Sequence, residues 1–398
     1  MYYSPIIFFL TGFLLSSCQE NLSIPGGTNE KARVSLSVSA ASTSSPHTGS
    51  EGKDAINSLH ILVFFGNRTT VLYGEQFAYA VKATRQKDNT FVATLLPSEH
   101  DKNLYRIVLL ANADDTKIAK LSMWTPYVDI SSTLYEDARQ RYPADAPVPM
   151  FGVVDGGECI QITENMSLGN IKLIRAVARV DIGVGTYDPG TEKWNLAPSA
   201  SDKYFTLTDV EAWSPMNRNL CMPGFRKFGY ETDGTPLVTG ASVDLGHSAT
   251  TALKWRYTGA DISNNSENEA TFCKNIIYLP EAPLAGYTAN QVADRGKRTT
   301  LIIGGLLHDP DNPVESGTKT WYRVDFTEAV GNTPDGPLFD ILRNHLYRFS
   351  LNVQRRGASS AQEAWELPAG EIIQITMGVV PWEDGGLIDM PISPAARH

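Results

Sequence analysis

Alternation of apolar and polar residues is the dominant pattern of this 398-residue chain. It is clearest in residues 34–40, whose sequence VSLSVSA changes between the two classes at every position. A period of two predicts a β-strand with one buried face, because successive side chains of a strand point to opposite sides. The buried face of this first strand would consist of Val34, Leu36, Val38 and Ala40.

Apolar runs of strand length recur along the rest of the chain, and segments rich in Gly, Pro, Asn and Asp separate them. The predicted strands are 56–65, 91–96, 105–111, 171–184, 205–213, 276–279, 299–303, 321–326, 346–353 and 372–380. Residues 114–150 are expected to be partly helical, and 147–152 to be extended because of its prolines. Long amphipathic helices are scarce, so the pattern is typical of β-sandwiches.

The length of the chain predicts two domains. We expect an all-β fold of two tandem β-sandwich (transthyretin-like) domains with few short helices. A turn at Gly169-Asn170 places the boundary near residue 172, which gives an N-terminal sandwich over 34–172 and a C-terminal sandwich over 173–398. No short sequence repeat is present, so any similarity between the two sandwiches would be a structural duplication only.

The first residues read as an export signal. Residues 2–17 are largely apolar and end in Leu15-Ser16-Ser17-Cys18, which fits a lipobox: an aliphatic residue, two small residues and a Cys. This predicts a lipoprotein signal peptide over 1–17, lipidation of Cys18 with palmitate-type acyl chains, and a polar tether over 18–33. The alternative is a plain secretory signal with a chance Cys, because residues 1–5 lack the usual Lys or Arg.

Composition narrows the classes of partner. The chain is 42% hydrophobic and carries a formal net charge of −10. An acidic globular chain is not expected to bind nucleic acid, which requires a basic face. After the signal, no apolar run is long enough to span a bilayer.

The cysteines give no metal or redox motif. Beyond Cys18 only Cys159, Cys221 and Cys273 remain, and no CxxC occurs. At most one disulfide is possible among these three, none is required, and ordinary buried thiols are the simpler interpretation.

No constellation of catalytic residues is apparent either. The seven His residues show no metal-ligand spacing, and His345 is interpreted as a turn residue at the start of a strand. Gly304-Gly305 and Gly385-Gly386 are interpreted as turns, because no phosphate-loop motif follows them. GxSxG is absent. We therefore predict no enzymatic activity, no metal and no cofactor.

Two further groups of residues left alternatives open. Asp114-Asp115 and Asp309-Pro310-Asp311 could bind Ca²⁺ weakly, although acidic loops without metal are the expected interpretation, since no EF-hand spacing occurs. Trp124, Trp194 and Trp255 could form a sugar-binding platform, although single aromatic residues are more often part of a core.

Several motifs, taken in order, resemble the fimbrillin family, the major and minor subunits of Bacteroidota type V fimbriae. Besides the lipobox and the alternating first strand, these are 104–112 (LYRIVLLAN), 148–152 (VPMFG), 175–180 (RAVARV), 277–281 (IYLPE), 343–349 (RNHLYRF) and 380–382 (VPW). The resemblance implies a structural subunit of a cell-surface fimbria, exported as an outer-membrane lipoprotein. Other fimbrial subunits would be its partners, with host or bacterial surface ligands as further candidates.

The resemblance also implies a mode of assembly. In such fimbrillins a protease cuts after an Arg in the loop that follows the first strand, and a strand of the next subunit fills the groove that remains. Here the loop 41–54 has no Arg and offers Lys53, while Arg33 lies before the predicted strand. The candidate processing residues are therefore Lys53 and Arg33, and an uncut anchor or accessory subunit is an open alternative. A surface glycan-binding lipoprotein is the alternative function.

Overall fold

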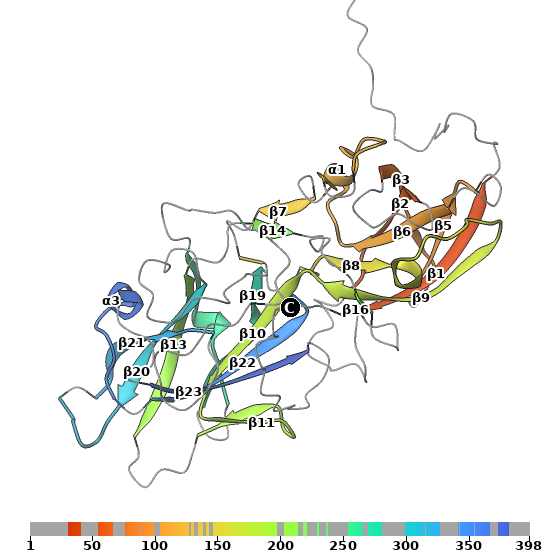
Figure 1. The fold of residues 1–398 in the computed structure, drawn as a ribbon. Coiled ribbons are helices and arrows are strands. Elements are labelled where there is room, and N and C mark those ends of the chain that lie inside the picture. The colour runs from red at the N-terminus through yellow and green to blue at the C-terminus, as the bar shows by residue number, and fades with distance from the viewer. Residues whose placement is uncertain are drawn as a thin grey trace, which may run out of the picture.

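The computed structural model describes most of the two predicted sandwiches. The described residues are 31–40, 55–66, 76–87, 89–98, 104–126, 129–130, 134–137, 141–142, 146–196, 203–213, 218–220, 229–230, 236–237, 254–265, 270–280, 299–314, 316–326, 341, 343–353, 355–366 and 373–381. Within them, strands dominate and the α-helices are two short ones, α1 and α3, so the prediction of an all-β fold with few short helices is confirmed (Figure 1).

The N-terminal strands form one eight-stranded sheet in the order β3-β2-β6-β8-β9-β1-β5-β4. Their bounds are β1 Ala32–Ala40, β2 Leu59–Gly66, β3 Gln76–Lys82, β4 Thr84–Arg85, β5 Thr90–Leu95, β6 Leu104–Ala111, β8 Met150–Val153 and β9 Met166–Arg175. The sheet folds over at β8, which pairs with β6 along most of its length but with β9 only through Met150 and Phe151. The two halves enclose the N-terminal core, to which β1 contributes Leu36 and β2 contributes Ile61.

The outer face of β2 and β6 carries a smaller apolar cluster. It includes Leu62 of β2, Val108 of β6 and Ile118 of helix α1 (Asp115–Ile118). The segment that was expected to be partly helical therefore covers the second face of this sheet, which explains why β2 is apolar at consecutive positions.

The C-terminal strands form two sheets that face each other. One has the order β18-β19-β10-β22-β23 and the other β17-β13-β20-β21. Their bounds are β10 Val177–Val184, β13 Tyr204–Trp213, β17 Lys254–Thr258, β18 Ser263–Asn264, β19 Thr271–Pro280, β20 Thr300–His308, β21 Thr318–Val324, β22 His345–Val353 and β23 Ile373–Pro381. Val180, Val210 and Phe349 lie in the core between the sheets.

The two sandwiches repeat the same topology, which the sequence did not reveal. In each, the first strand pairs antiparallel with one strand and parallel with a late strand: β1 with β5 and β9, and β10 with β19 and β22. The other sheet also corresponds, since β3-β2-β6-β8 has the antiparallel pairings of β17-β13-β20-β21. The correspondence in chain order is β1 with β10, β2 with β13, β3 with β17, β4 with β18, β5 with β19, β6 with β20, β8 with β21 and β9 with β22.

Short elements complete the described structure. They are β7 Tyr135–Asp137, β11 Thr186–Asp188, β12 Lys193–Asn195, β14 Arg218–Leu220, β15 Gly229–Tyr230, β16 Pro236–Leu237, α3 Ala361–Glu366 and the 3₁₀ turns η2 Val154–Gly157 and η3 Gly259–Asp261. The β11–β12 hairpin places Trp194 against β10, where the indole covers Gly183 and donates to the carbonyl of Phe349 at 3.2 Å. The pairing of β7 with β14 connects the two halves of the chain.

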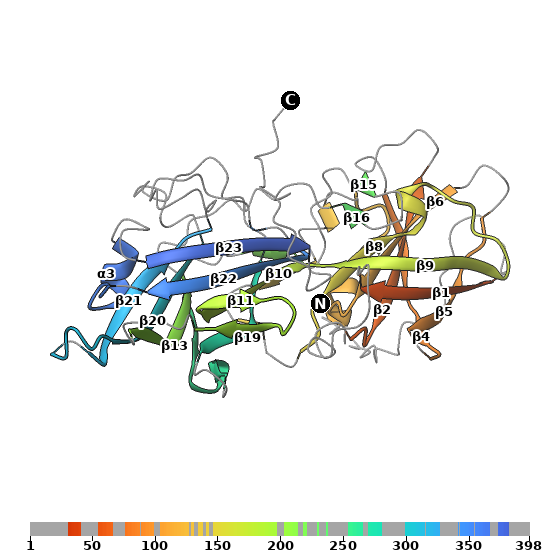
Figure 2. The ribbon, with the colours of Figure 1, turned by 90° about the horizontal axis from the view of Figure 1, so that it is seen from below.

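The junction between the sandwiches is short. Only Ala176 separates β9 from β10, so the last strand of one sandwich leads directly into the first strand of the other (Figure 2). Arg175 still pairs with Met150 in the N-terminal sheet. We therefore propose Ala176 as the domain boundary, slightly beyond the predicted residue 172.

Three local predictions are wrong. The predicted strand 171–184 is two strands, β9 and β10. Gly169-Asn170 is not a turn but a bulge inside β9, where Gly169 has φ +76 and the register with β1 shifts. Gly304-Gly305 is not a turn either, since both residues pair with neighbouring strands within β20. Glycine is needed at these positions because the Trp321 ring lies over Gly304 and the Phe205 ring packs on Gly305, which leaves no space for a side chain.

Candidate functional site in the first strand

The predicted first strand is β1, and it lies inside its sheet. It pairs antiparallel with β5, from Ala32 opposite Leu95 to Ser37 opposite Thr90. On its other side it pairs parallel with β9, from Val34 opposite Met166 to Ala40 opposite Leu173. A segment from the extreme N-terminal end of the fold therefore completes the main-chain pairing of two strands that do not pair with each other.

Side chains of β1 alternate between core and surface as predicted. Ala32, Val34, Leu36 and Val38 are at most 2% exposed, whereas Arg33 is exposed and Ser35, Ser37 and Ser39 are partly exposed. A fully buried Val or Leu side chain is worth roughly 1.5–3 kcal/mol. The strand is thus held by several kcal/mol of apolar burial in addition to its hydrogen bonds.

The surroundings of β1 are apolar and chemically inert. Its buried side chains face residues such as Phe91, Leu168 and Tyr79. Burial raises the pKa of Tyr79, whose hydroxyl accepts from the amide of Leu96 at 3.0 Å. The polar contact of the strand is on its exposed side, where the hydroxyl of Ser37 lies 3.3 Å from Oδ1 of Asn170. Such a site can hold or release a strand, but it offers no reactive group.

The candidate processing residues differ in position. The sequence analysis placed Arg33 before the first strand, but this prediction is wrong. Arg33 lies inside β1, opposite Thr94, and its side chain is exposed. A protease requires an extended, unpaired backbone, so strand pairing protects the bond after Arg33. Lys53 and Cys18, the predicted lipidation site, lie outside the described residues, as does the side chain of Ala40.

The acidic loops that might have held Ca²⁺ use their carboxylates within the protein. Asp114 caps α1 by accepting from the amide of Thr116 at 2.8 Å, and this bond together with that from the Thr116 hydroxyl lowers the pKa of Asp114. Asp115 pairs with Lys82 at 2.5 Å. Asp309 pairs with Lys203, which lowers the pKa of Asp309. Within the described residues no group of three or more His, Cys, Asp or Glu is placed to hold a metal ion.

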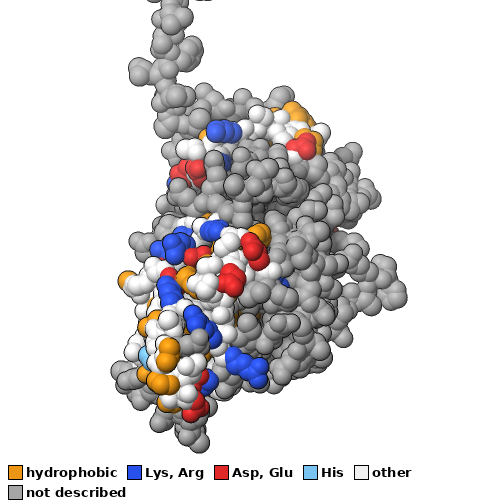
Figure 3. Space-filling model, turned by 90° about the vertical axis from the view of Figure 1, so that its left-hand side faces the viewer, with side chains coloured by type: hydrophobic (Ala, Val, Ile, Leu, Met, Phe, Trp, Pro, Cys, Tyr) orange, Lys and Arg blue, Asp and Glu red, His pale blue; other side chains and the backbone are white. Residues whose placement is uncertain are grey.

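A second acidic group lies on the outer face of the C-terminal sheet. Asp209 and Glu211 of β13 are buried, and each has a cationic partner on another strand of the same sheet: Asp209 pairs with Lys319 of β21 at 2.5 Å, and Glu211 pairs with Arg256 of the adjacent β17 at 2.9 Å. Figure 3 views this end of the molecule and shows acidic and basic side chains interleaved on its described part. Two carboxylates with cross-strand partners form an ion-pair network that links strands, so this pair is interpreted as structural.

The remaining sequence candidates are dispersed. His345 begins β22, and its Nδ1 lies 2.8 Å from the carbonyl of Arg343. Cys159 is half-buried and Cys273 is buried; burial raises the pKa of Cys273, which makes this thiol unreactive. Cys221 and Gly385-Gly386 lie outside the described residues.

The three tryptophans considered as a sugar platform do not form one. Trp194 and Trp255 are buried in the C-terminal half at 0% and 3% exposure, as expected for core residues. Trp124 is 54% exposed, against that expectation, and stacks on Phe65 with ring centroids 4.7 Å apart. A single exposed ring does not supply the two or three coplanar aromatic residues of a glycan platform.

The sequence did not reveal the contact that joins the sandwiches. Oδ1 of Asn344 accepts from the backbone amide of Arg175 at 3.2 Å and from Nη1 of the same residue at 3.0 Å. The amide of Asn344 donates to the carbonyl of Val177. We call Arg175 and Asn344 the junction clamp. The motifs 175–180 and 343–349 contain its two residues, but only the fold brings them together.

Membrane attachment by a helix finds no support in the described part of the chain: no helix there is long and apolar enough to cross a bilayer. The predicted signal segment 1–17 is outside that part.

Comparison with known proteins gives a family match within the N-terminal part of the chain. A model of the major fimbrial subunit protein (FimA) family matches residues 32–170, which begin at the first residue of β1 and end within β9. No match was found among the curated proteins.

Among solved structures, the chain is similar to a putative cell adhesion protein from Parabacteroides distasonis, with a TM-score of 0.50 and 14% identity over 89% of this chain and 100% of the other. The truncated tip fimbrial protein Mfa3 from Porphyromonas gingivalis gives 0.47 and 13% over 89% and 100%, and a fimbrilin (FimA) from the same species gives 0.46 and 16% over 89% and 98%. At such identity, the first of these likenesses shows a shared fold. Together with the family match it confirms the resemblance drawn from the motifs: residues 32–170 of this chain are similar to the FimA family of major fimbrial subunit proteins.

Proposed function

We propose that this chain is a structural subunit of a cell-surface fimbria, and that β1 is the strand exchanged when subunits join. The family match supports the structural role. The observation that supports strand exchange is the position of β1. It is an N-terminal strand that lies between β5 and β9, and its apolar residues are buried in the core.

Loss of β1 would open one groove with two unpaired strand edges. The edges of β5 and β9 would lose their main-chain partner, and the core would lose the side chains of Val34, Leu36 and Val38. A strand from a neighbouring subunit could restore both the hydrogen bonds and the apolar contacts. Repeated contacts of this head-to-tail kind do not close on themselves and build a filament.

The internal duplication indicates why exchange would occur at one end of the subunit. β10 holds the equivalent position in the C-terminal sandwich, between β19 and β22. However, β10 follows β9 after Ala176 alone and is tied there by the junction clamp. It cannot leave without breaking the chain, so each subunit would offer one acceptor groove.

Processing and anchoring complete the proposal. Cleavage at Lys53 would free β1 together with the tether, whereas cleavage at Arg33 would leave Val34–Ala40 in place. A subunit that is not cut keeps Cys18 and its lipid, and would suit an anchor or accessory position in an outer-membrane fimbrium. Contacts with host or bacterial surface ligands are an additional possibility for an exposed subunit.

The experiment is to compare residues 19–398 with a variant that begins at Asp54 and thus lacks β1. The shorter variant should be less stable, should form dimers or fibres, and should bind a synthetic peptide of residues 32–40. A peptide with Asp in place of Leu36 and Val38 is the matched control, because its strand pattern is kept while its apolar face is lost. Size-exclusion chromatography with light scattering and peptide titration supply the readouts.

A variant without residues 19–53 that stays monomeric, keeps the stability of the longer chain and ignores the peptide would show that strand exchange is the wrong mechanism. Recovery of uncut, lipidated chain from native fimbriae would instead support the anchor role.

A further inference from the structure

The C-terminal sandwich contains a buried guanidinium nitrogen that has no acceptor. It belongs to Arg348 of β22, a residue with 5% exposure, and the atom without a hydrogen-bond partner is Nε. Other buried arginines have acceptors. Arg179 donates to Asp181 through Nη2 at 2.7 Å. Arg323 donates to Asp325 through Nε at 2.9 Å. Because it is unfavourable to bury a cation without an acceptor, Arg348 is a candidate binding group.

The carboxylates near Arg348 are already engaged. Asp181 of β10 lies opposite Arg348, but its oxygens accept from Arg179 and, at 2.9 Å, from a backbone amide of β19. Glu192, which also acts on Arg348 electrostatically, pairs with a lysine of β19 at 2.9 Å. On the other side of β22, the residue opposite Arg348 is Gly378, which has no side chain. Among the described residues, Arg348 is therefore left without a counter-ion of its own.

The β11–β12 hairpin places a second donor at this guanidinium. Cζ of Arg348 lies 3.8 Å from the centroid of the Tyr187 ring. The hydroxyl at the rim of this ring is buried and has no hydrogen-bond partner. Burial raises the pKa of Tyr187, so the hydroxyl keeps its proton and can donate it to an anion. Stacking uses the face of a guanidinium and leaves its N–H groups, which lie in its plane, available to an acceptor.

Both donors are held in place by the fold. Figure 2 shows β11 alongside β22 in the C-terminal half, and the two strands are in contact. Trp194 of β12 packs edge-on against Tyr187, with ring centroids 4.8 Å apart. The same indole covers Gly183 of β10 and donates to a carbonyl of β22, which fixes the hairpin on the sheet. The position of the Tyr187 ring over Arg348 is thus set by packing and requires no ligand.

We propose that Arg348 and Tyr187 form a binding site for a small oxyanion, either a carboxylate or a phosphate group. These are the anions that a guanidinium binds with two parallel hydrogen bonds, and the phenolic hydroxyl supplies a further donor. The low exposure of the two side chains, 5% and 7%, limits the ligand to a small group. The inference is independent of strand exchange, because every part of the site belongs to the C-terminal sandwich.

Titration of the intact chain, residues 19–398, with acetate and separately with inorganic phosphate provides the test, with chloride at equal ionic strength as the reference salt. The readout is the Nε–H resonance of Arg348 in protein with isotope-labelled arginine, assigned by its loss in Arg348→Lys. This resonance should shift and saturate with acetate or phosphate and should stay in place with chloride. The anion with the lower dissociation constant tells the two ligand classes apart.

Three variants separate the two donors. Tyr187→Phe keeps the ring against the guanidinium and removes only the hydroxyl, so it should weaken anion binding about tenfold or more. Tyr204→Phe, on the opposite sheet, is the matched control and should leave binding unchanged. Arg348→Lys keeps the charge but loses the planar donors, so it should abolish the rise in thermal midpoint that the anion gives the unmodified chain.

Two results would overturn the proposal. The first is an Arg348 resonance that does not respond, or that drifts without saturation in all three salts, because the guanidinium would then serve only to pack on the Tyr187 ring. The second is equal anion affinity of Tyr187→Phe and the unmodified chain. Since the resonance is followed in the unmodified protein, the first result does not depend on whether a variant folds.

Discussion

Two asparagines next to strand ends have left-handed backbone and bind neighbouring main-chain groups through their side chains. Asn112 follows β6 with φ +57, and its side chain accepts from the amide of Asn57 and donates to the carbonyl of Val148. Asn344 precedes β22 with φ +56 and accepts from Arg175. Left-handed backbone is tolerated by Asn better than by most residues, and its amide can satisfy neighbouring main-chain groups. This explains Asn in the motifs 104–112 and 343–349.

The junction clamp gives a prediction at the residue scale. Asn344→Ala should destabilise the chain by about 1–3 kcal/mol, because the buried Arg175 loses an acceptor and Ala is strained at positive φ. Asn344→Gly removes the acceptor without the strain and should cost less. Asn344→Asp keeps an oxygen and should cost least. Urea unfolding followed by hydrogen exchange at β9 and β10 measures the series; a reversed order would contradict the role of the acceptor.

Strands with equivalent positions differ in how they are retained. β1 and β10 occupy the same place in their sandwiches, but β10 is buried along its whole length and carries Asp181 at 0% exposure, paired with Arg179 at 2.7 Å. β1 alternates between buried residues and residues that are exposed or partly exposed. The first strand is thus held by apolar burial and main-chain pairing, both of which a replacement strand can supply.

At the scale of the element, the apolar face should decide how firmly β1 is held. Leu36→Ala removes a side chain with 2% exposure and should lower the free energy of unfolding by about 2–5 kcal/mol. Ser37→Ala, one residue further on the opposite face, is the matched control and should cost less than about 1 kcal/mol. Because the described chain contains two sandwiches, the loss should be followed by hydrogen exchange of the β5 and β9 amides and not in a global unfolding transition. Equal effects of the two substitutions would show that burial does not hold the strand.

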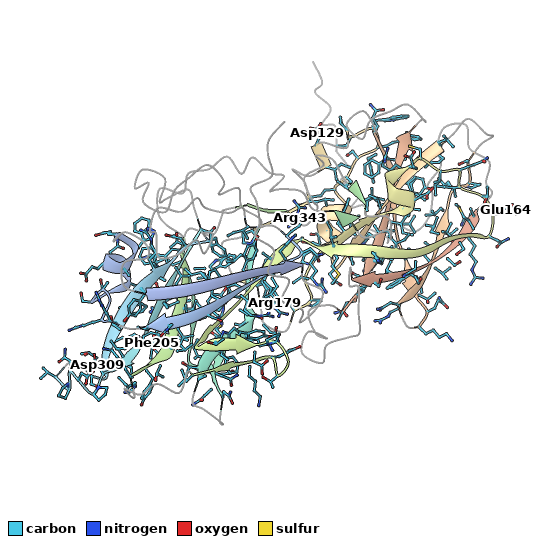
Figure 4. The ribbon with its side chains drawn as sticks, turned by 60° about the horizontal axis from the view of Figure 1, so that its bottom comes forward. Asp129, Glu164, Arg179, Phe205, Asp309 and Arg343 are labelled. Carbon is cyan, nitrogen blue, oxygen red and sulfur yellow. The ribbon has the colours of Figure 1, made fainter. Side chains whose placement is uncertain are left out.

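The whole molecule is elongated, with its two sandwiches in series. Glu164 and Asp309 lie near opposite ends and Arg343 lies between them (Figure 4). Val177 and Tyr278 from the C-terminal strands pack into the N-terminal core, and Arg141 reaches Asp261 of the other half at 2.7 Å. These contacts, with the junction clamp, make the two sandwiches one continuous body.

The predicted membrane attachment concerns the whole molecule, because a single lipidated residue would hold all of it. Cys18→Ala in cells should abolish incorporation of labelled acyl chains and release the protein from the membrane fraction, since multiple acyl chains are what makes such anchoring durable. Ser17→Thr is a control that leaves the thiol in place. Unchanged membrane retention without detectable lipid would contradict the lipoprotein prediction.

Local pattern determined much of this fold. The strands β2, β5, β6, β13, β20, β21, β22 and β23 lie where the sequence predicts them, with shifts of a few residues at their ends. The buried face of β1 was predicted from its period of two, because one side of that strand meets water and the other the core. Short strands such as β4 and β18 escaped prediction, since two residues carry no period.

Other features were decided only by tertiary structure. The pattern of 171–184 reads as one strand because both β9 and β10 are apolar, and only the change of pairing partners at Ala176 separates them. Gly304-Gly305 reads as a turn, but the rings of Trp321 and Phe205 need the space above these glycines. The place of β1 between β5 and β9, the duplication and the junction clamp all depend on residues far apart in the chain. The hydrophobic period of a strand shows which of its faces is buried. It does not encode the hydrogen bonds between strands, and these bonds decide which strands lie side by side.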